Sequence, residues 1–146
     1  MIFGNKIELL HEMAEKKLVS SLAINIAEFL CGLEKNLSEE EKTALAAVSA
    51  LLYEWISSGS ICLTKDDIKT FIETNGEALS GIGFPNWEKI GSILSKSSCC
   101  TSDSEKEQRP VVLEGERIYF YKYWLYETSL AEKVLKLFRL PGKYLE

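Results

Sequence analysis

The four cysteines and the single histidine are the residues with the most specific chemistry in this sequence. Cys31 and Cys62 stand among apolar residues, Cys99 and Cys100 are adjacent, and His11 is the only imidazole. A zinc site needs cysteines or histidines at short paired spacings, and no two cysteines here form a C-x-x-C pair. We therefore expect no metal site, with Cys31 and Cys62 buried as small thiols. Cys99 and Cys100 lie in a polar stretch and are expected to be exposed, and His11 is expected to be a solvated surface residue.

Patterns for nucleotide binding or nucleophilic catalysis are also missing. No G-x-x-x-x-G-K-[ST] phosphate loop occurs. The Gly81-Ile82-Gly83 segment has Asn86 where a dinucleotide fingerprint needs its third glycine, and no strand precedes it. With one histidine, no Ser–His or Cys–His dyad is convincing. The acidic run at residues 39–41 is a helix start rather than a catalytic carboxylate pair. We expect no catalytic, cofactor-binding or metal-binding residue in this segment.

The composition is that of one globular domain. The 146 residues are 46% hydrophobic and 27% charged, with a formal net charge of −5. The hydrophobic content is enough to form a core. The negative net charge argues against DNA binding, because a protein that neutralises DNA phosphates usually carries a basic face. No apolar run has the length of a membrane span, and charged residues follow the N-terminus too closely for a signal peptide. The sequence therefore predicts a cytoplasmic protein that does not bind a membrane.

Helical periodicity dominates the first half of the chain. Residues 1–36 predict two short helices that pack as a pair, and Ser38 with Glu41 forms a capping box that begins a third helix. This third helix is apolar over more than one stripe and should lie at the centre of the core. The two expected stripes of the helical pair are Ile7, Leu10, Ala14 and Leu18, and then Leu22, Ile26, Phe29, Leu30 and Leu33.

Shorter elements follow in the second half. Residues 60–63 predict a brief strand. Thr64 with Asp67 then caps a helix that stops near residue 75. Residues 77–85 predict a loop. Asn86 caps one more helix. Residues 95–108 show no apolar periodicity and predict a mobile loop.

A β-hairpin and a last helix complete the expected fold. Residues 111–120 predict a hairpin with a II′ turn at Gly115-Glu116, which pairs Leu113 with Ile118 and places both on the core face. A final helix is expected over residues 122–138, and Pro141-Gly142 after it is the expected stop signal. The fold class is mainly α with a small β-hairpin (α+β). Residues 1–36 form a helical pair, residues 37–140 form a winged-helix-like unit packed with it as one domain, and residues 141–146 form a linker or an expression-vector scar.

The order helix, strand, helix, helix, hairpin is that of a winged-helix domain, which often binds DNA. The helix that would enter the major groove holds Glu88, Lys89 and Lys96, and the hairpin tip is acidic. The element order fits DNA binding while the charges argue against it, so protein binding is the preferred use of this architecture. A free-standing winged-helix DNA-binding or regulatory module remains the alternative.

Three blocks of the sequence resemble the N-terminal domain of RecD, the alpha subunit of exodeoxyribonuclease V (the RecBCD helicase–nuclease). They are residues 46–63 ending in GSICL, the NWE of residues 86–88, and PVVLEGERIYF of residues 110–120 with Trp124 and Glu127 beyond. The resemblance implies a non-catalytic domain that docks on the gamma subunit (RecC-like), and through it on the beta subunit (RecB-like). It also implies that ATP and Mg²⁺ bind in a helicase core outside this segment, with roles in DNA recombination and repair.

One surface of the hairpin is a candidate partner interface. If the register is right, Val112, Tyr119 and Tyr121 share the face opposite the core, with Tyr123 and Tyr126 nearby. Tyrosines suit interfaces because they combine an apolar ring with a polar tip. The competing interpretation is that the final helix or the loop covers them as a second core layer.

Overall fold

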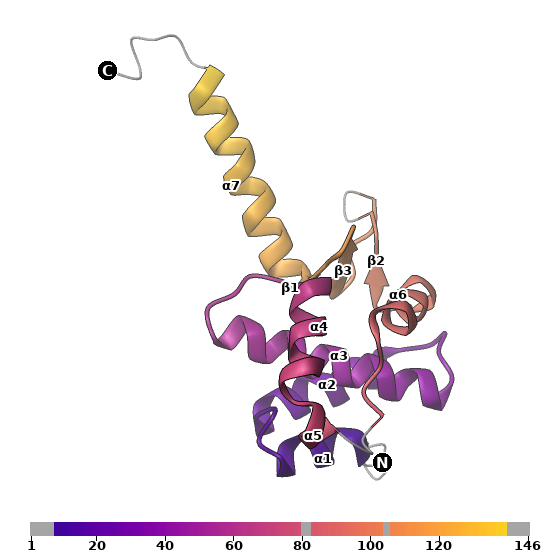
Figure 1. Cartoon of the computed structure of the whole chain (residues 1–146). Helices are drawn as coiled ribbons and strands as arrows, with labels where there is room; N and C mark the ends of the chain where they lie inside the picture. The colour runs from indigo at the N-terminus through magenta and orange to yellow at the C-terminus, as the bar shows by residue number, and fades with distance from the viewer. Residues whose placement is uncertain (1–7, 80–82, 104–105, 140–146) are drawn as a thin grey trace.

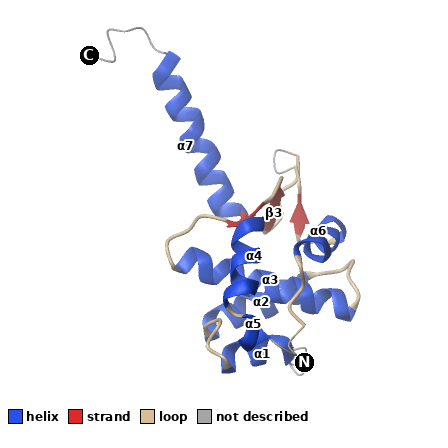
Figure 2. Cartoon of the chain, viewed as in Figure 1, coloured by secondary structure: helices blue, strands red, loops and turns tan. Residues whose placement is uncertain are grey.

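The structure, a computed structural model, describes residues 8–79, 83–103 and 106–139 (Figure 1). It confirms a mainly helical α+β fold (Figure 2). Ile7, residues 80–82 and the expected stop at residues 141–142 lie outside the described residues. The helices are α1 (Glu8–Glu15), α2 (Ser21–Leu33), α3 (Glu39–Ser57), α4 (Lys65–Thr74), α5 (Gly76–Leu79), α6 (Trp87–Lys96) and α7 (Tyr121–Arg139), and the strands are β1 (Leu63–Thr64), β2 (Cys100–Thr101), β3 (Val111–Glu114) and β4 (Arg117–Phe120).

Helix α3 lies at the centre of the core, as its sequence predicts. Ser38 and Glu41 form the capping box at its start, and all nine residues from Ala44 to Leu52 are buried. A helix that is buried on every side needs neighbours on every side. Helices α1 and α2 pack on one part of α3, while α6, β1 and β4 contact it elsewhere.

The expected core stripe of α2 is only partly right, because Leu30 is buried but the other four residues are not. Its buried residues are Ala23, Ile24, Ala27, Leu30 and Cys31, whereas Leu22, Phe29 and Leu33 are exposed and Ile26 is half-buried. The two alanines are fully buried where α2 meets the alanine-rich α3. Small side chains let two helix backbones approach closely, so the larger side chains of α2 lie on the outside.

The four strands form one mixed sheet in the order β1-β4-β3-β2. The hairpin register is confirmed, with Leu113 opposite Ile118. A II′ turn requires a positive φ at its first central residue only. Gly115 has φ +62° and Glu116 has no positive φ, so the turn meets this requirement. Strand β1, which begins later than residue 60, pairs antiparallel with β4, so the hairpin joins the helical unit as in a winged-helix domain.

The described residues between 77 and 108 form more regular secondary structure than their composition predicts. Residues up to Leu79 form α5, and Ser95 and Lys96 complete α6. Cys100 and Thr101 then form β2, which runs parallel to β3. Because both cysteines are buried against the core, the expected exposure of Cys99 and Cys100 is wrong.

Candidate functional site

The tyrosine surface expected on the hairpin is largely inside the protein. Val112 and Tyr119 are each only 1% exposed, so their expected exposure is wrong. Helix α7 starts directly after β4 and contacts both hairpin strands, while Val111 and Ile118 are buried on the opposite face. The hairpin is therefore buried on both faces, in agreement with the second-layer interpretation for these two residues. Tyr121 and Tyr123 are half-buried and Tyr126 is 59% exposed.

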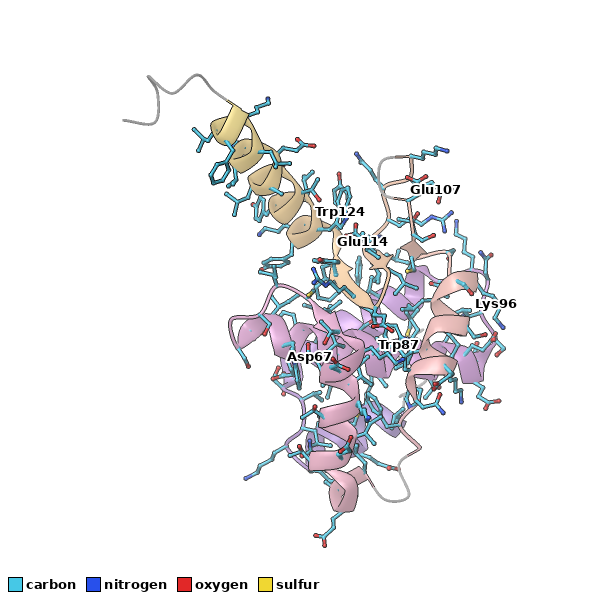
Figure 3. All side chains as sticks on the ribbon, turned by 45° about the horizontal axis from the view of Figure 1, so that its top comes forward. Asp67, Trp87, Lys96, Glu107, Glu114 and Trp124 are labelled. Atoms are coloured by element: carbon cyan, nitrogen blue, oxygen red, sulfur yellow. The ribbon has the colours of Figure 1, made fainter. Side chains whose placement is uncertain are left out.

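The N-terminal end of α7 is fixed to the hairpin by side-chain and backbone contacts. The Trp124 Nε1–H donates to Oε2 of Glu114 at 2.8 Å (Figure 3). The Tyr121 backbone N–H donates to the Pro110 carbonyl at 2.9 Å, and the Tyr121 and Trp124 rings stack with centroids 6.0 Å apart. These contacts set the direction in which α7 leaves the sheet, and Figure 1 shows it projecting away from the other helices.

Along α7, apolar side chains at helical spacing form a row that is half-buried at its first residue and exposed beyond it. The α7 row is defined as Tyr123, Tyr126, Leu130, Val134 and Leu137, which share one side of a helix with 3.6 residues per turn. Leu130 is 63% exposed and Leu137 is 54% exposed. Of these five residues, sequence reasoning singled out only the two tyrosines as interface residues. Helical periodicity could have identified the row, because its residues are three or four positions apart. The hairpin contacts only the start of α7, which leaves the rest of the row exposed.

A second exposed apolar surface runs along α2. The α2 stripe is defined as Leu22, Ile26, Phe29 and Leu33, and its Phe29 ring is 64% exposed. Together with Leu30, which is buried, these are the residues that helical periodicity assigned to the core. Contiguous exposed apolar side chains commonly mark interaction surfaces. The structure thus offers two candidate docking surfaces, one on α2 and one on α7.

Glu34, which is 5% exposed and the most buried carboxylate among the described residues, has a structural role. Its oxygens accept hydrogen bonds from the Ser97 hydroxyl, from the Ser98 N–H and hydroxyl, and from the Asn36 N–H. Burial alone would raise the pKa of Glu34, but these hydrogen bonds outweigh it and hold the pKa at about 2. The ionised Glu34 therefore ties the end of α2 to the segment between α6 and β2.

The three buried thiols show no sign of catalytic activation, and Cys62, which was expected to be buried, is half-buried. Burial raises the pKa of Cys31 and Cys100 to about 12 and that of Cys99 to about 11, so these thiols stay protonated and unreactive. His11 lies on α1 with its Nε2 4.0 Å from Oε2 of Glu28. Within the described ranges, no group of three or more His, Cys, Asp or Glu side chains could hold a metal ion.

The two lysines of α6, the helix that would meet DNA in a winged-helix protein, are already paired with glutamates. On α6, Lys89 lies 3.8 Å from Glu40, and Lys96 bonds with Glu41, both at the start of α3. A cleft of about 320 Å³ separates the start of α6 from α4, and its lining includes Trp87. Because two lysines and two glutamates line this cleft, it offers no net positive charge to a phosphate. No described helix has the length and hydrophobicity needed to span a membrane.

Comparison with known families agrees with this architecture. A family model described as the RecBCD enzyme subunit RecD, N-terminal domain, matches residues 15–119. The chain belongs to the family of RecD N-terminal domains. The match extends from the end of α1 through the hairpin, so this RecD-type domain includes the α2 stripe, whereas α7 follows the matched region. A comparison with curated proteins found no match.

Proposed function

We propose that this RecD-type domain is a non-catalytic interaction module of the alpha subunit of exodeoxyribonuclease V, an ATP-dependent DNA helicase/nuclease of recombinational double-strand-break repair in the cytoplasm. In this proposal the domain docks on the gamma subunit (RecC-like) and through it associates with the beta subunit (RecB-like). ATP and Mg²⁺ would act in a helicase core outside these residues. The observation that carries the proposal is the family match over residues 15–119.

The chemistry of the described residues supports a binding role. The buried thiols are protonated, the buried carboxylate is occupied by hydrogen bonds, and the lysines of α6 are paired with glutamates. By contrast, α2 and α7 expose large apolar side chains at helical spacing. Exposed apolar rows on helices are the feature that protein–protein docking uses. Docking is therefore the function that the geometry supports best.

The proposal is tested by co-expressing the chain with the gamma subunit of the same organism. We expect the two to co-purify as a 1:1 complex, measured by size-exclusion chromatography with light scattering. The control is an unrelated winged-helix domain of similar size and charge under the same conditions. If the chain elutes apart from the gamma subunit at micromolar concentrations of both, the proposed function is wrong.

A further inference from the structure

One nitrogen atom of the only histidine is shielded from water without a partner. Among the residues that the structure describes, Nε2 of His11 is the buried side-chain nitrogen or oxygen that forms no hydrogen bond. The His11 side chain as a whole is 43% exposed, so its ring lies at the surface with Nε2 turned inward. A buried polar atom without a partner costs free energy, and native proteins contain few of them. This atom is therefore a candidate for a functional role.

A carboxylate of the neighbouring helix faces this nitrogen. Nε2 of His11, on α1, lies 4.0 Å from Oε2 of Glu28, on α2. Hydrogen bonds between a charged N–H and a carboxylate are about 2.7–2.9 Å long, so the two groups face each other without being bonded. A rotation of the Glu28 carboxylate toward the ring forms the bond when Nε2 carries a proton. On α1 itself, Glu12 is adjacent to His11 and Glu15 follows by one helical turn, and both carboxylates also favour the protonated ring.

The other elements beside α1 bring no free positive charge to this pair. The nine buried residues of α3 include no titratable side chain. Glu54, near the end of α3, accepts the backbone N–H of Ser20. Lys16, in the turn after α1, donates its Nζ–H to the Ala78 carbonyl of α5. The charges around His11 are therefore those of carboxylates.

Helix α1 is short, so its position depends on few contacts. It has eight residues and buries Leu9, Leu10 and Met13 in the core. Helices shorter than about 12–15 residues are marginal in water, so α1 is stable because it packs against α2 and α3. A short helix with few buried side chains opens locally more easily than a central helix such as α3. A single added bond to α2 therefore changes how often α1 detaches.

We propose that His11 and Glu28 form a pH-sensitive clasp between α1 and α2. Histidine ordinarily changes its charge between pH 5 and 8. Below this range the protonated Nε2 donates to Glu28 and the clasp is closed. As the pH rises, the proton leaves, the bond is lost and α1 detaches more readily. Detachment exposes Leu10 and Met13 together with the parts of α2 and α3 that they cover. The clasp is a property of the folded chain and does not depend on the proposed docking function.

The test is amide hydrogen exchange of the 146-residue chain, measured by NMR from pH 5.5 to pH 8 and corrected for the intrinsic exchange rate at each pH. The informative amides are those of residues 12–16, which are hydrogen-bonded along α1. Their opening equilibrium constant should rise about threefold over this range, because a partly exposed ion pair contributes only modestly to stability. These amides should also exchange faster than those of α3 at every pH, which identifies local opening of α1.

Three variants assign the effect to the pair. His11→Gln and Glu28→Gln should both remove most of the dependence on pH, because each removes one half of the clasp. Glu12→Gln is the matched control, since it removes a carboxylate from the same helix and leaves both members of the pair in place. This control should keep the rise seen in the wild type. Because the chain has only one histidine, a single variant separates the imidazole from all other titrating groups.

Each outcome supports or rejects the clasp. If the opening constant of the wild type does not change with pH, or if His11→Gln keeps the change, the imidazole is not the switch and the inference is wrong. If His11→Gln removes the change and Glu28→Gln keeps it, His11 acts with another group and the pairing with Glu28 is wrong. If the amides of α1 and α3 exchange equally fast, α1 opens only with the whole domain and the clasp is rejected.

Discussion

Replacing Glu34 by glutamine tests whether one buried carboxylate joins two distant parts of the fold. The carboxylate accepts hydrogen bonds from Ser97, Ser98 and Asn36, and its pKa is about 2 against an ordinary value of 4.5. This difference corresponds to about 3 kcal/mol of folding free energy at neutral pH. Glutamine keeps the shape but loses the charge and brings two N–H donors toward groups that already donate. We expect Glu34→Gln to lower the free energy of unfolding at pH 7 by about 3 kcal/mol.

The pH dependence of this loss follows from the direction of the pKa shift. The folded-state pKa of Glu34 is depressed, so its contribution is complete above the unfolded value of 4.5 and is lost as the pH falls toward about 2. Between pH 7 and pH 3.5 the difference between wild type and Glu34→Gln should shrink by about 1.4 kcal/mol. Urea unfolding followed by circular dichroism at the two pH values measures both quantities.

The control for this prediction is Glu73→Gln, on the exposed face of α4. An exposed substitution away from special contacts usually changes stability by less than about 0.5 kcal/mol. A loss below about 1 kcal/mol for Glu34→Gln, or a loss that is equal at pH 7 and pH 3.5, would refute the reasoning. A small loss would mean that the charge of Glu34 contributes little to stability. An equal loss at both pH values would mean that the loss does not come from the ionisation of Glu34.

Four other outcomes follow from the structure. Tyr119→Ala should lower the free energy of unfolding by about 3 kcal/mol or more in thermal melts, because the ring is buried; an unchanged melting temperature would contradict this. Lys17 has φ 59°, so Lys17→Gly should stabilise the chain by up to about 1 kcal/mol, and Lys17→Ala serves as the control. Cys99 and Cys100 should react with a thiol reagent only after denaturant is added, and rapid native-state labelling would disprove their burial. Duplex DNA should bind with a Kd of about 10⁻⁴ M or weaker in fluorescence anisotropy at physiological salt, and submicromolar binding would favour the DNA-binding alternative.

Local chemistry made several elements predictable from the sequence. The capping boxes at Ser38 and Thr64 locate the starts of α3 and α4, because side-chain and backbone groups three residues apart satisfy each other. The hairpin register follows from Gly115, which allows the positive φ of the turn, and from the alternation of side chains in the strands. These features depend on residues close together in the chain.

The features that sequence reasoning missed depend on distant residues. The α2 stripe was assigned to the core because leucine and phenylalanine are more hydrophobic than alanine, yet Ala23 and Ala27 allow the close approach to α3. Ser97 can be buried because its hydroxyl donates a hydrogen bond to Glu34, which lies 63 residues earlier in the chain. The candidate docking surface was only partly predictable for the same reason, since Tyr119 is buried by contacts that its own strand does not reveal.

The two-residue strands at the borders of the sheet limit how a partner can bind. Strand β1 forms one border and β2 the other, and each has only two residues, while β3 and β4 lie between them. A peptide that joins a sheet as an extra strand needs a longer row of free backbone N–H and C=O groups. Strand β1 pairs with Arg117 and Ile118 of the hairpin, and β2 pairs with Val111 and Val112, so each border strand covers half of its neighbour. The two short border strands therefore offer little to an added strand, whereas the helices offer long rows of exposed side chains to a partner.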